Sequence, residues 1–187
     1  MLHKSCREAH IYMIDKTESY TEVCLLKRGK ATLLKCIAAP LLVGAVSAFV
    51  SGGGMRMIAL LDKPPLSPPG WLFPLVWTVL YTFMGIASYL VLTPDAARSE
   101  EISEAMDVYI YQLIVNFLWP VFFFNFKWYL FSFFWLILLW VLIIVMLRRF
   151  RGISKAAFWL ILPYLAWVTF AGYLNLGIWW LNQGHSS

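Results

Sequence analysis

The sequence predicts an all-α integral membrane protein, built as a bundle of five transmembrane helices. Of the 187 residues, 61% are hydrophobic and only 13% are charged, whereas soluble globular proteins are about 45–50% apolar. Aromatic residues make up 18% of the chain, as expected where side chains meet lipid and its interfaces. Five apolar runs follow one another, each long enough to cross a hydrocarbon core of roughly 30 Å. Helices satisfy their own backbone in lipid, and no alternating pattern suggests a β-barrel.

Polar or helix-breaking segments separate the five runs. Residues 1–30 are mixed and polar, and we interpret them as a loose leader without a cleaved signal peptide. Residues 52–54 are consecutive glycines that end the first run. The acidic segment 94–107 is expected to be a solvated loop with a short helical start. The predicted helices cover about residues 31–51, 71–92, 108–126, 129–147 and 156–181, and residues 183–187 form a tail.

The positive charges predict that the N-terminus lies inside the cell. Of the 15 Lys and Arg residues, all but three lie in the N-terminal region or in the loops after the second and fourth helices, which share one side of the membrane. The exceptions, Arg56, Lys63 and Lys127, lie on the opposite side, so the positive-inside rule gives the orientation. Topology also explains the net charge of +5. The basic residues form no stripe with exposed aromatics, so nucleic acid is not an expected partner.

The predicted helices contain no acidic residue or histidine that could act in conventional enzyme catalysis. No acidic residue interrupts a predicted helix, and His3, His10 and His185 all lie outside the helices. A buried proton relay, a haem axial ligand and a metal-ligand cluster are therefore not expected. The three cysteines lie in the first fifth of the chain without metal-ligand or CxxC spacing, and we interpret them as reduced thiols.

Polar residues inside the third predicted helix are informative, because lipid contact does not explain them. Gln112, Asn116 and Pro120 recur every four residues and therefore share one helical face. Two interpretations stay open: these groups hydrogen-bond between helices and hold the bundle together, or the Asn116 amide contacts a ligand.

Large aromatic residues stand beside small ones in the second and fifth helices. Trp77 and Tyr81 share a face of the second helix with small residues, and Trp167, Ala171 and Asn175 follow one line along the fifth. Such a combination can shape a cavity, or it can simply pack as core. The spacing alone does not separate these alternatives.

Three longer stretches are more distinctive. They are "LDKPPLSPPGWLFPLVWTVLYTFMGIASYLV" (61–91), "NFLWPVFFF" (116–124) and "LPYLAWVTFAGYLN" (162–175). Together they resemble the TspO/MBR family, the tryptophan-rich sensory proteins whose animal members are called translocator protein or peripheral-type benzodiazepine receptor. The resemblance covers about residues 36–182. It implies a five-helix bundle, commonly a homodimer, that binds porphyrins and other flat apolar molecules between its helices.

The resemblance also implies a lid and a set of pocket residues. The lid is the loop 52–70, whose prolines limit its freedom, so that less entropy is lost when a ligand is enclosed. The pocket residues carried over from the family are Pro68, Trp77, Tyr81, Asn116, Phe122, Trp167 and Ala171.

The leading functional expectation is a membrane receptor or sensor of tetrapyrroles with a regulatory or stress-response role. Porphyrin or haem would be a ligand rather than an obligatory cofactor. One alternative is transport of tetrapyrroles or other apolar molecules. A second is light-dependent porphyrin degradation, in which Trp167 would be the reactive residue. The type of sequence suggests a bacterial plasma membrane as the location.

Departures from the family pattern carry two further expectations. The lid has Met57, Ile58 and Leu66 where relatives often carry aromatic residues, so ligand stacking by the lid should be weaker. No basic residue follows Lys155 apart from a protonated His185, so sterol recognition at the end of the fifth helix is not expected.

Overall fold

The computed structural model describes residues 29–52, 61–93 and 98–183. Residues 1–35 and 36–187 form separate units, and the fold described below belongs to the second. The expectations for residues 1–28, for Met57 and Ile58, and for residues 184–187 lie outside the described residues. Among the residues described, five helices are long and apolar enough to cross a membrane, and no strand occurs. The chain is therefore an integral membrane protein of the predicted all-α class.

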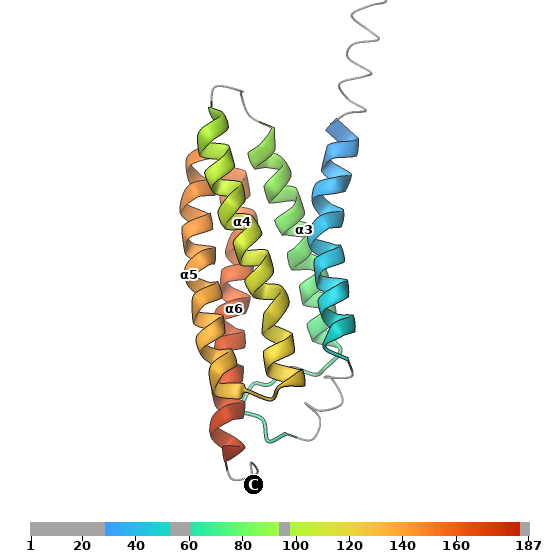
Figure 1. The fold of residues 1–187 in the computed structure, drawn as a ribbon, viewed down its shortest axis with the longest axis vertical. Coiled ribbons are helices and arrows are strands. Elements are labelled where there is room, and N and C mark those ends of the chain that lie inside the picture. The colour runs from blue at the N-terminus through green and yellow to red at the C-terminus, as the bar shows by residue number, and fades with distance from the viewer. Residues whose placement is uncertain (1–28, 53–60, 94–97, 184–187) are drawn as a thin grey trace, which may run out of the picture. The chain divides into compact units, whose positions relative to one another are not determined.

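Helices α3 to α6 lie side by side in the second unit (Figure 1). α5 packs against both of its neighbours in sequence, and α3 packs against α6, whereas α3 and α4 make few contacts with each other. The bounds are Leu72–Leu92 for α3, Ser99–Pro120 for α4, Tyr129–Ile153 for α5 and Lys155–Leu181 for α6. The sparse contact between α3 and α4 leaves room in this part of the bundle.

A further helix, Gly29–Val50, carries no label and is blue in Figure 1. Its residues from Cys36 onward belong to the same unit as α3 and α4. The Ser47 hydroxyl donates to the Phe117 carbonyl oxygen of α4 at 2.8 Å. On the α3 side, a Cβ added to Gly85 would lie only 2.7 Å from the Cys36 carbonyl oxygen. The helix therefore touches both α3 and α4 and bridges the gap between them.

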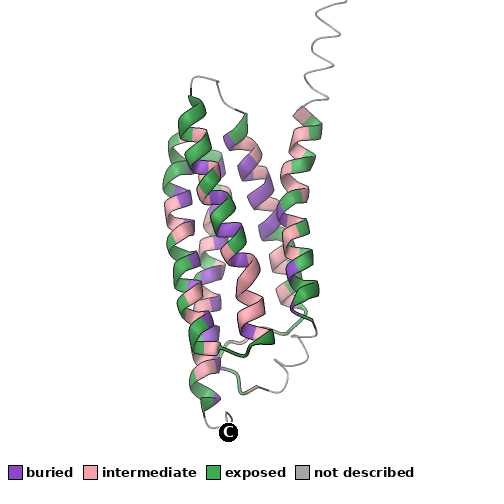
Figure 2. Ribbon diagram, in the orientation of Figure 1, coloured by how far each residue is buried: buried purple, intermediate pink, exposed green. Residues whose placement is uncertain are grey.

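Buried residues follow the inward faces of the helices, and exposed residues follow the outward faces (Figure 2). The core includes Met84 from α3, Leu139 and Ile143 from α5, and Tyr164 from α6, all with no exposed surface. The exposed faces are also apolar, as in Leu75, Ile114, Phe134, Ile137, Trp159 and Trp180. Apolar residues on both faces are typical of helices that pack on one side and meet lipid on the other.

Two helices extend beyond the lengths predicted from hydrophobicity. α4 begins at Ser99 instead of about 108, and α5 continues past 147 to Ile153. Acidic residues in the first turn of α4 suit the positive end of the helix dipole, and basic residues suit the last turn of α5. An ion pair between Glu104 and Arg149 joins the two extensions. A hydrophobicity window detects the apolar part of a helix and misses such solvated turns.

The third span ends in a wider turn. The segment η2, Val121–Asn125, follows Pro120 as a π-helix. Proline has no backbone N–H, so the ordinary hydrogen bond to the carbonyl four residues earlier cannot form, and the turn relaxes. Short π-helical segments inside α-helices are frequent at functional sites.

Candidate functional site

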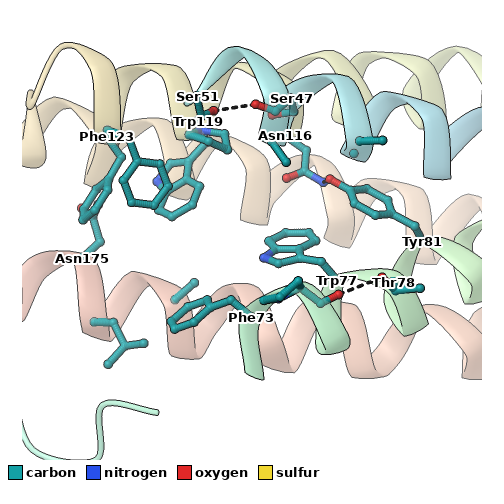
Figure 3. A pocket seen from close by; sticks show the side chains of 18 of the residues that line it. Ser47, Ser51, Phe73, Trp77, Thr78, Tyr81, Asn116, Trp119, Phe123 and Asn175 are labelled. Carbon is teal, nitrogen blue, oxygen red and sulfur yellow. Dashed lines mark hydrogen bonds between the residues drawn. The ribbon is translucent and has the colours of Figure 1, made fainter. Parts of the chain in front are cut away.

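A cavity of about 800 Å³ lies inside the second unit (Figure 3). Its walls come from α3, α4 with η2, α6, the C-terminal half of helix Gly29–Val50, and the proline-rich segment before α3, while α5 contributes none. This volume lies within the range of about 300–1,000 Å³ that accommodates small organic ligands.

Aromatic rings form two of the walls. Trp77 and Tyr81 on α3 lie with ring centroids 5.4 Å apart. On the opposite side, Trp119 stacks on Phe123 at 5.2 Å. All four side chains line the cavity, together with Phe73 at the start of α3. Flat ring systems pack favourably against such surfaces by stacking or edge contacts, which add about 0.5–1.5 kcal/mol per aromatic pair beyond the area buried.

The wall from helix Gly29–Val50 combines Leu41 and Leu42 with several small residues. Gly44, Ala45 and Ala48 line the cavity there, beside Ser47 and Ser51. Both serine hydroxyls donate to backbone carbonyl oxygens, Ser47 to Phe117 and Ser51 to Ser47 itself. Because their protons are engaged within the protein, this wall offers shape more than polarity.

Two polar side chains of α4, Asn116 and Gln112, form hydrogen bonds to neighbouring helices, and we call this pair with its partners the polar ladder. The Asn116 amide nitrogen donates to the Tyr81 hydroxyl oxygen at 3.3 Å. One turn earlier on α4, the carbonyl oxygen of Gln112 accepts from the Tyr164 hydroxyl at 2.9 Å, and the Gln112 amide nitrogen reaches the Met84 sulfur at 3.8 Å. Gln112 therefore bonds between helices, as one of the two sequence interpretations held. Asn116 does so too, but it also lines the cavity.

Other buried polar groups near the cavity have no partner. Both amide atoms of Asn175 and the indole nitrogen of Trp119 are buried without a hydrogen bond. Unsatisfied buried groups are uncommon, and each calls for a physical explanation.

The proline-rich segment is attached to the end of α6. The Asp62 N–H donates to the Asn182 side-chain oxygen at 3.1 Å, and the Asn182 amide nitrogen donates to the Asp62 carbonyl oxygen at 2.9 Å. The Tyr173 hydroxyl donates to the Pro65 carbonyl oxygen at 2.9 Å. A Cβ on Gly177 would lie 2.6 Å from Pro64, so only glycine permits this contact. Lys63, Ser67 and Pro68 from this segment line the cavity. Residues 61–70 are a described part of the lid expected over 52–70, and we call these residues the lid.

Five of the seven residues expected from the family resemblance line this one cavity: Pro68, Trp77, Tyr81, Asn116 and Ala171. They come from the lid and from three different helices, and the fold brings them together. Leu66, at the lid position where an aromatic residue is usual, is 83% exposed, so its side chain turns away from the cavity.

Phe122 and Trp167 do not line the cavity. Phe122 packs instead against Trp128 and Trp135 on the other side of η2. Phe122 and Phe123 are neighbours in the π-helical segment and point to different sides of it, and Phe123 is the one that lines the cavity. Trp167 makes an edge contact with Phe73 at 5.8 Å and is one ring removed from the cavity.

Sequence reasoning did not single out several cavity residues. Trp119 and Phe123 lie within the quoted motif around Asn116. Pro120 was already placed on the Asn116 face, and the seven-residue spacing would have identified Phe123 as a further neighbour on it. Gly44 and Ala48 form a small-xxx-small pair, a pattern that marks close helix approach in membranes. Phe73 gave no signal, since an aromatic residue at a helix start is equally typical of an interfacial anchor.

Comparison with known proteins finds sequence similarity to one family. A sequence model of the TspO/MBR family matches residues 36–181. The chain is 38% identical over 152 residues to the tryptophan-rich protein TspO of Chlorobaculum tepidum, covering 81% of this chain and 96% of that protein. It is 36% identical to the translocator protein of Ovis aries, covering 74% of this chain and 82% of that one. Protein CrtK of Rhodobacter capsulatus is 33% identical over 75% of this chain and 86% of its own.

Proposed function

The chain belongs to the TspO/MBR family, and on that premise we propose that it is a membrane receptor or sensor that binds flat apolar ligands, porphyrin-type tetrapyrroles among them, in the cavity under the lid. The observation that carries the proposal is a ligand-sized cavity lined by Trp77 on α3, Trp119 on α4 and Ala171 on α6. The small side chain of Ala171 leaves room where the aromatic rings supply stacking surface.

A space-filling substitution tests the proposal. Ala171→Phe places a ring inside the cavity, and we expect porphyrin affinity to fall. Overpacking typically costs about 1–3 kcal/mol, which corresponds to roughly 5- to 150-fold weaker binding. Leu176→Phe is the matched control, because Leu176 lies on the same helix, is 38% exposed and does not line the cavity. Binding is measured by titrating the purified protein with protoporphyrin IX and following porphyrin absorbance.

Equal affinities of the two variants for protoporphyrin IX would count against this cavity as the binding site. A second comparison separates the tryptophans. Trp77→Leu should weaken binding more than Trp167→Leu, because only Trp77 lines the cavity. The opposite order would favour a different site.

A second candidate function is light-dependent porphyrin degradation. The observation that favours it is that two indole rings, those of Trp77 and Trp119, line the cavity. The reactive residue would then be one of these and not Trp167. Illumination of the wild-type complex, the Trp77→Phe variant and the Trp119→Phe variant, with product analysis by mass spectrometry, tests it. The same products from all three and from free porphyrin in detergent would eliminate this function.

Three finer expectations accompany the proposal: a homodimer, a bacterial plasma membrane and an inside N-terminus. The last is supported by the charges at the two ends of the bundle. The Arg98 guanidinium donates to the Gly152 carbonyl oxygen at 3.3 Å, so the start of α4 and the last turn of α5 meet at one end. Arg148, Arg151 and Lys155 belong to that same end, which the positive-inside rule assigns to the cytoplasm.

A further inference from the structure

The lid end of the cavity contains hydrogen-bonding groups that no described residue satisfies. Asn175 is 1% exposed, and neither its amide nitrogen nor its carbonyl oxygen has a partner. The indole nitrogen of Trp119 is buried without an acceptor as well. Both residues line the cavity, and Figure 3 shows them toward the end lined by Phe123, away from Tyr81. Leaving such groups unpaired is costly, so a ligand that pairs them gains specificity.

A positive charge lies near the same end. Lys63 is the charged member of the described residues that line the cavity, and those residues include no carboxylate. It precedes Pro64, which contacts α6 at Gly177, two positions after Asn175. The ion pair found in the described part of the chain joins Arg149 and Glu104, so Lys63 has no anionic partner there.

The donors and acceptors at the lid end of the cavity indicate which chemical group of a ligand would pair with them. The Lys63 ammonium, the Trp119 N–H and the Asn175 amide nitrogen are donors, and within this group of residues the Asn175 carbonyl oxygen is the one acceptor without a partner. A carboxylate is an acceptor with two oxygens and about four lone-pair positions, and it carries the charge that Lys63 would offset. A purely apolar ligand would leave every one of these groups unpaired.

We propose that Asn175, Trp119 and Lys63 form a polar subsite that binds a carboxylate carried by the flat ligand. This inference rests on the proposed function and deepens it, because it specifies both the class of ligand and its orientation. The ring system lies in the cavity against Trp77, and the acid group points toward the lid. The Asn175 amide turns about its side-chain torsions to present its nitrogen to the carboxylate. The subsite thereby distinguishes a free acid from its ester.

The test compares protoporphyrin IX, which has two carboxylates, with its uncharged dimethyl ester in the same detergent. The measured quantity is the ratio of the ester Kd to the acid Kd, obtained by porphyrin absorbance titration. Partition into detergent affects this ratio equally for every variant and therefore cancels between them. We expect the wild-type protein to favour the acid. We expect Asn175→Leu to reduce acid affinity roughly tenfold, the effect typical of losing one hydrogen bond to a charged group, while ester affinity changes less than about twofold.

Two further variants keep the test decisive. Trp119→Phe removes the N–H and retains a ring for stacking on Phe123, and Lys63→Gln removes the charge. Each should lower the acid preference. Lys127→Gln is the matched control, since Lys127 lies in a connection at the same end of the bundle and does not line the cavity. Ester binding in each variant reports an intact cavity, so a folding defect in Asn175→Leu leaves the other two variants to decide.

The outcomes separate the two proposals. An acid preference that falls in the three subsite variants and persists in Lys127→Gln supports the subsite. A wild-type protein that binds acid and ester equally, or a preference unchanged in all variants, overturns the subsite and leaves the proposed function standing. Wild-type protein that binds neither porphyrin removes the proposed function, and the subsite with it.

Discussion

Gly85 on α3 allows close packing of the helix Gly29–Val50, which forms one wall of the cavity. Substitution of Gly85 by alanine tests that packing. The added Cβ would lie 2.7 Å from the Cys36 carbonyl oxygen and closer still to the Ile37 Cα. Both obstacles are backbone atoms, so no side-chain rotation relieves the clash, and the helix Gly29–Val50 must move away from α3. Overpacking of this kind costs about 1–3 kcal/mol, and the better helix propensity of alanine returns up to about 1 kcal/mol.

The net expectation for Gly85→Ala is a loss of about 1–2 kcal/mol, because the steric cost exceeds the gain in propensity. For a protein of this size each kcal/mol corresponds to roughly 2–4 °C in Tm, so the melting temperature in detergent should fall by about 2–8 °C. The matched control is Gly172→Ala in α6, where the nearest atom to the new Cβ is a ring carbon of Phe133 at 3.9 Å. That variant keeps the propensity gain without the clash and should melt at or slightly above the wild-type temperature.

The reasoning would be refuted if Gly85→Ala melted as high as Gly172→Ala. That result would mean that the helix Gly29–Val50 does not approach α3 as closely as the backbone contact requires. A melting temperature that falls together with porphyrin affinity would support the interpretation that this helix contact shapes the cavity as well as the bundle.

Three other predictions follow from named contacts. Asn182→Ala removes both hydrogen bonds to Asp62 and should free the lid, so porphyrin dissociation measured by stopped flow should accelerate several-fold; an unchanged dissociation rate would show that the lid does not control release. Tyr164→Phe leaves the buried Gln112 oxygen without its donor, which should cost about 1–3 kcal/mol of stability and be visible as a lower Tm; wild-type stability would mean that the ladder is not needed for packing. In a cysteine-free background, Lys127→Cys should react with a membrane-impermeant maleimide in intact cells and Gly152→Cys should not, because the positive-inside rule assigns them to opposite faces; reversed labelling would invert the proposed orientation.

The sequence was sufficient for the number and type of the membrane helices, because apolar length is a direct consequence of bilayer thickness. It was less informative about their ends. The acidic residues of 99–107 look like a loop to a hydrophobicity scale, yet Glu104 pairs with Arg149 and the helix continues through them. Such pairing depends on the distance between α4 and α5, which no local pattern in either helix encodes.

The cavity could be predicted only in part, because local sequence patterns do not encode how side chains on different helices meet. Residues on the inward faces, such as Trp77 and Asn116, were found through spacing and motif resemblance, since periodicity fixes which residues share a face. Phe122 was misplaced because a motif position does not state which way a side chain points. The orphaned amide of Asn175 could not be recognised from sequence at all, because the lack of a partner becomes visible only when every neighbouring side chain has been placed.

The central claim is that a flat ligand lies inside the bundle, in the cavity lined by α3, α4 and α6. An experimental structure of the protein saturated with protoporphyrin IX tests it most directly. We predict planar ligand density in the cavity lined by Trp77, Trp119 and Ala171, with an acid group directed toward Asn175 under the lid. Density confined to the lipid-facing surfaces, with the space between these residues closed by their own side chains, would contradict it.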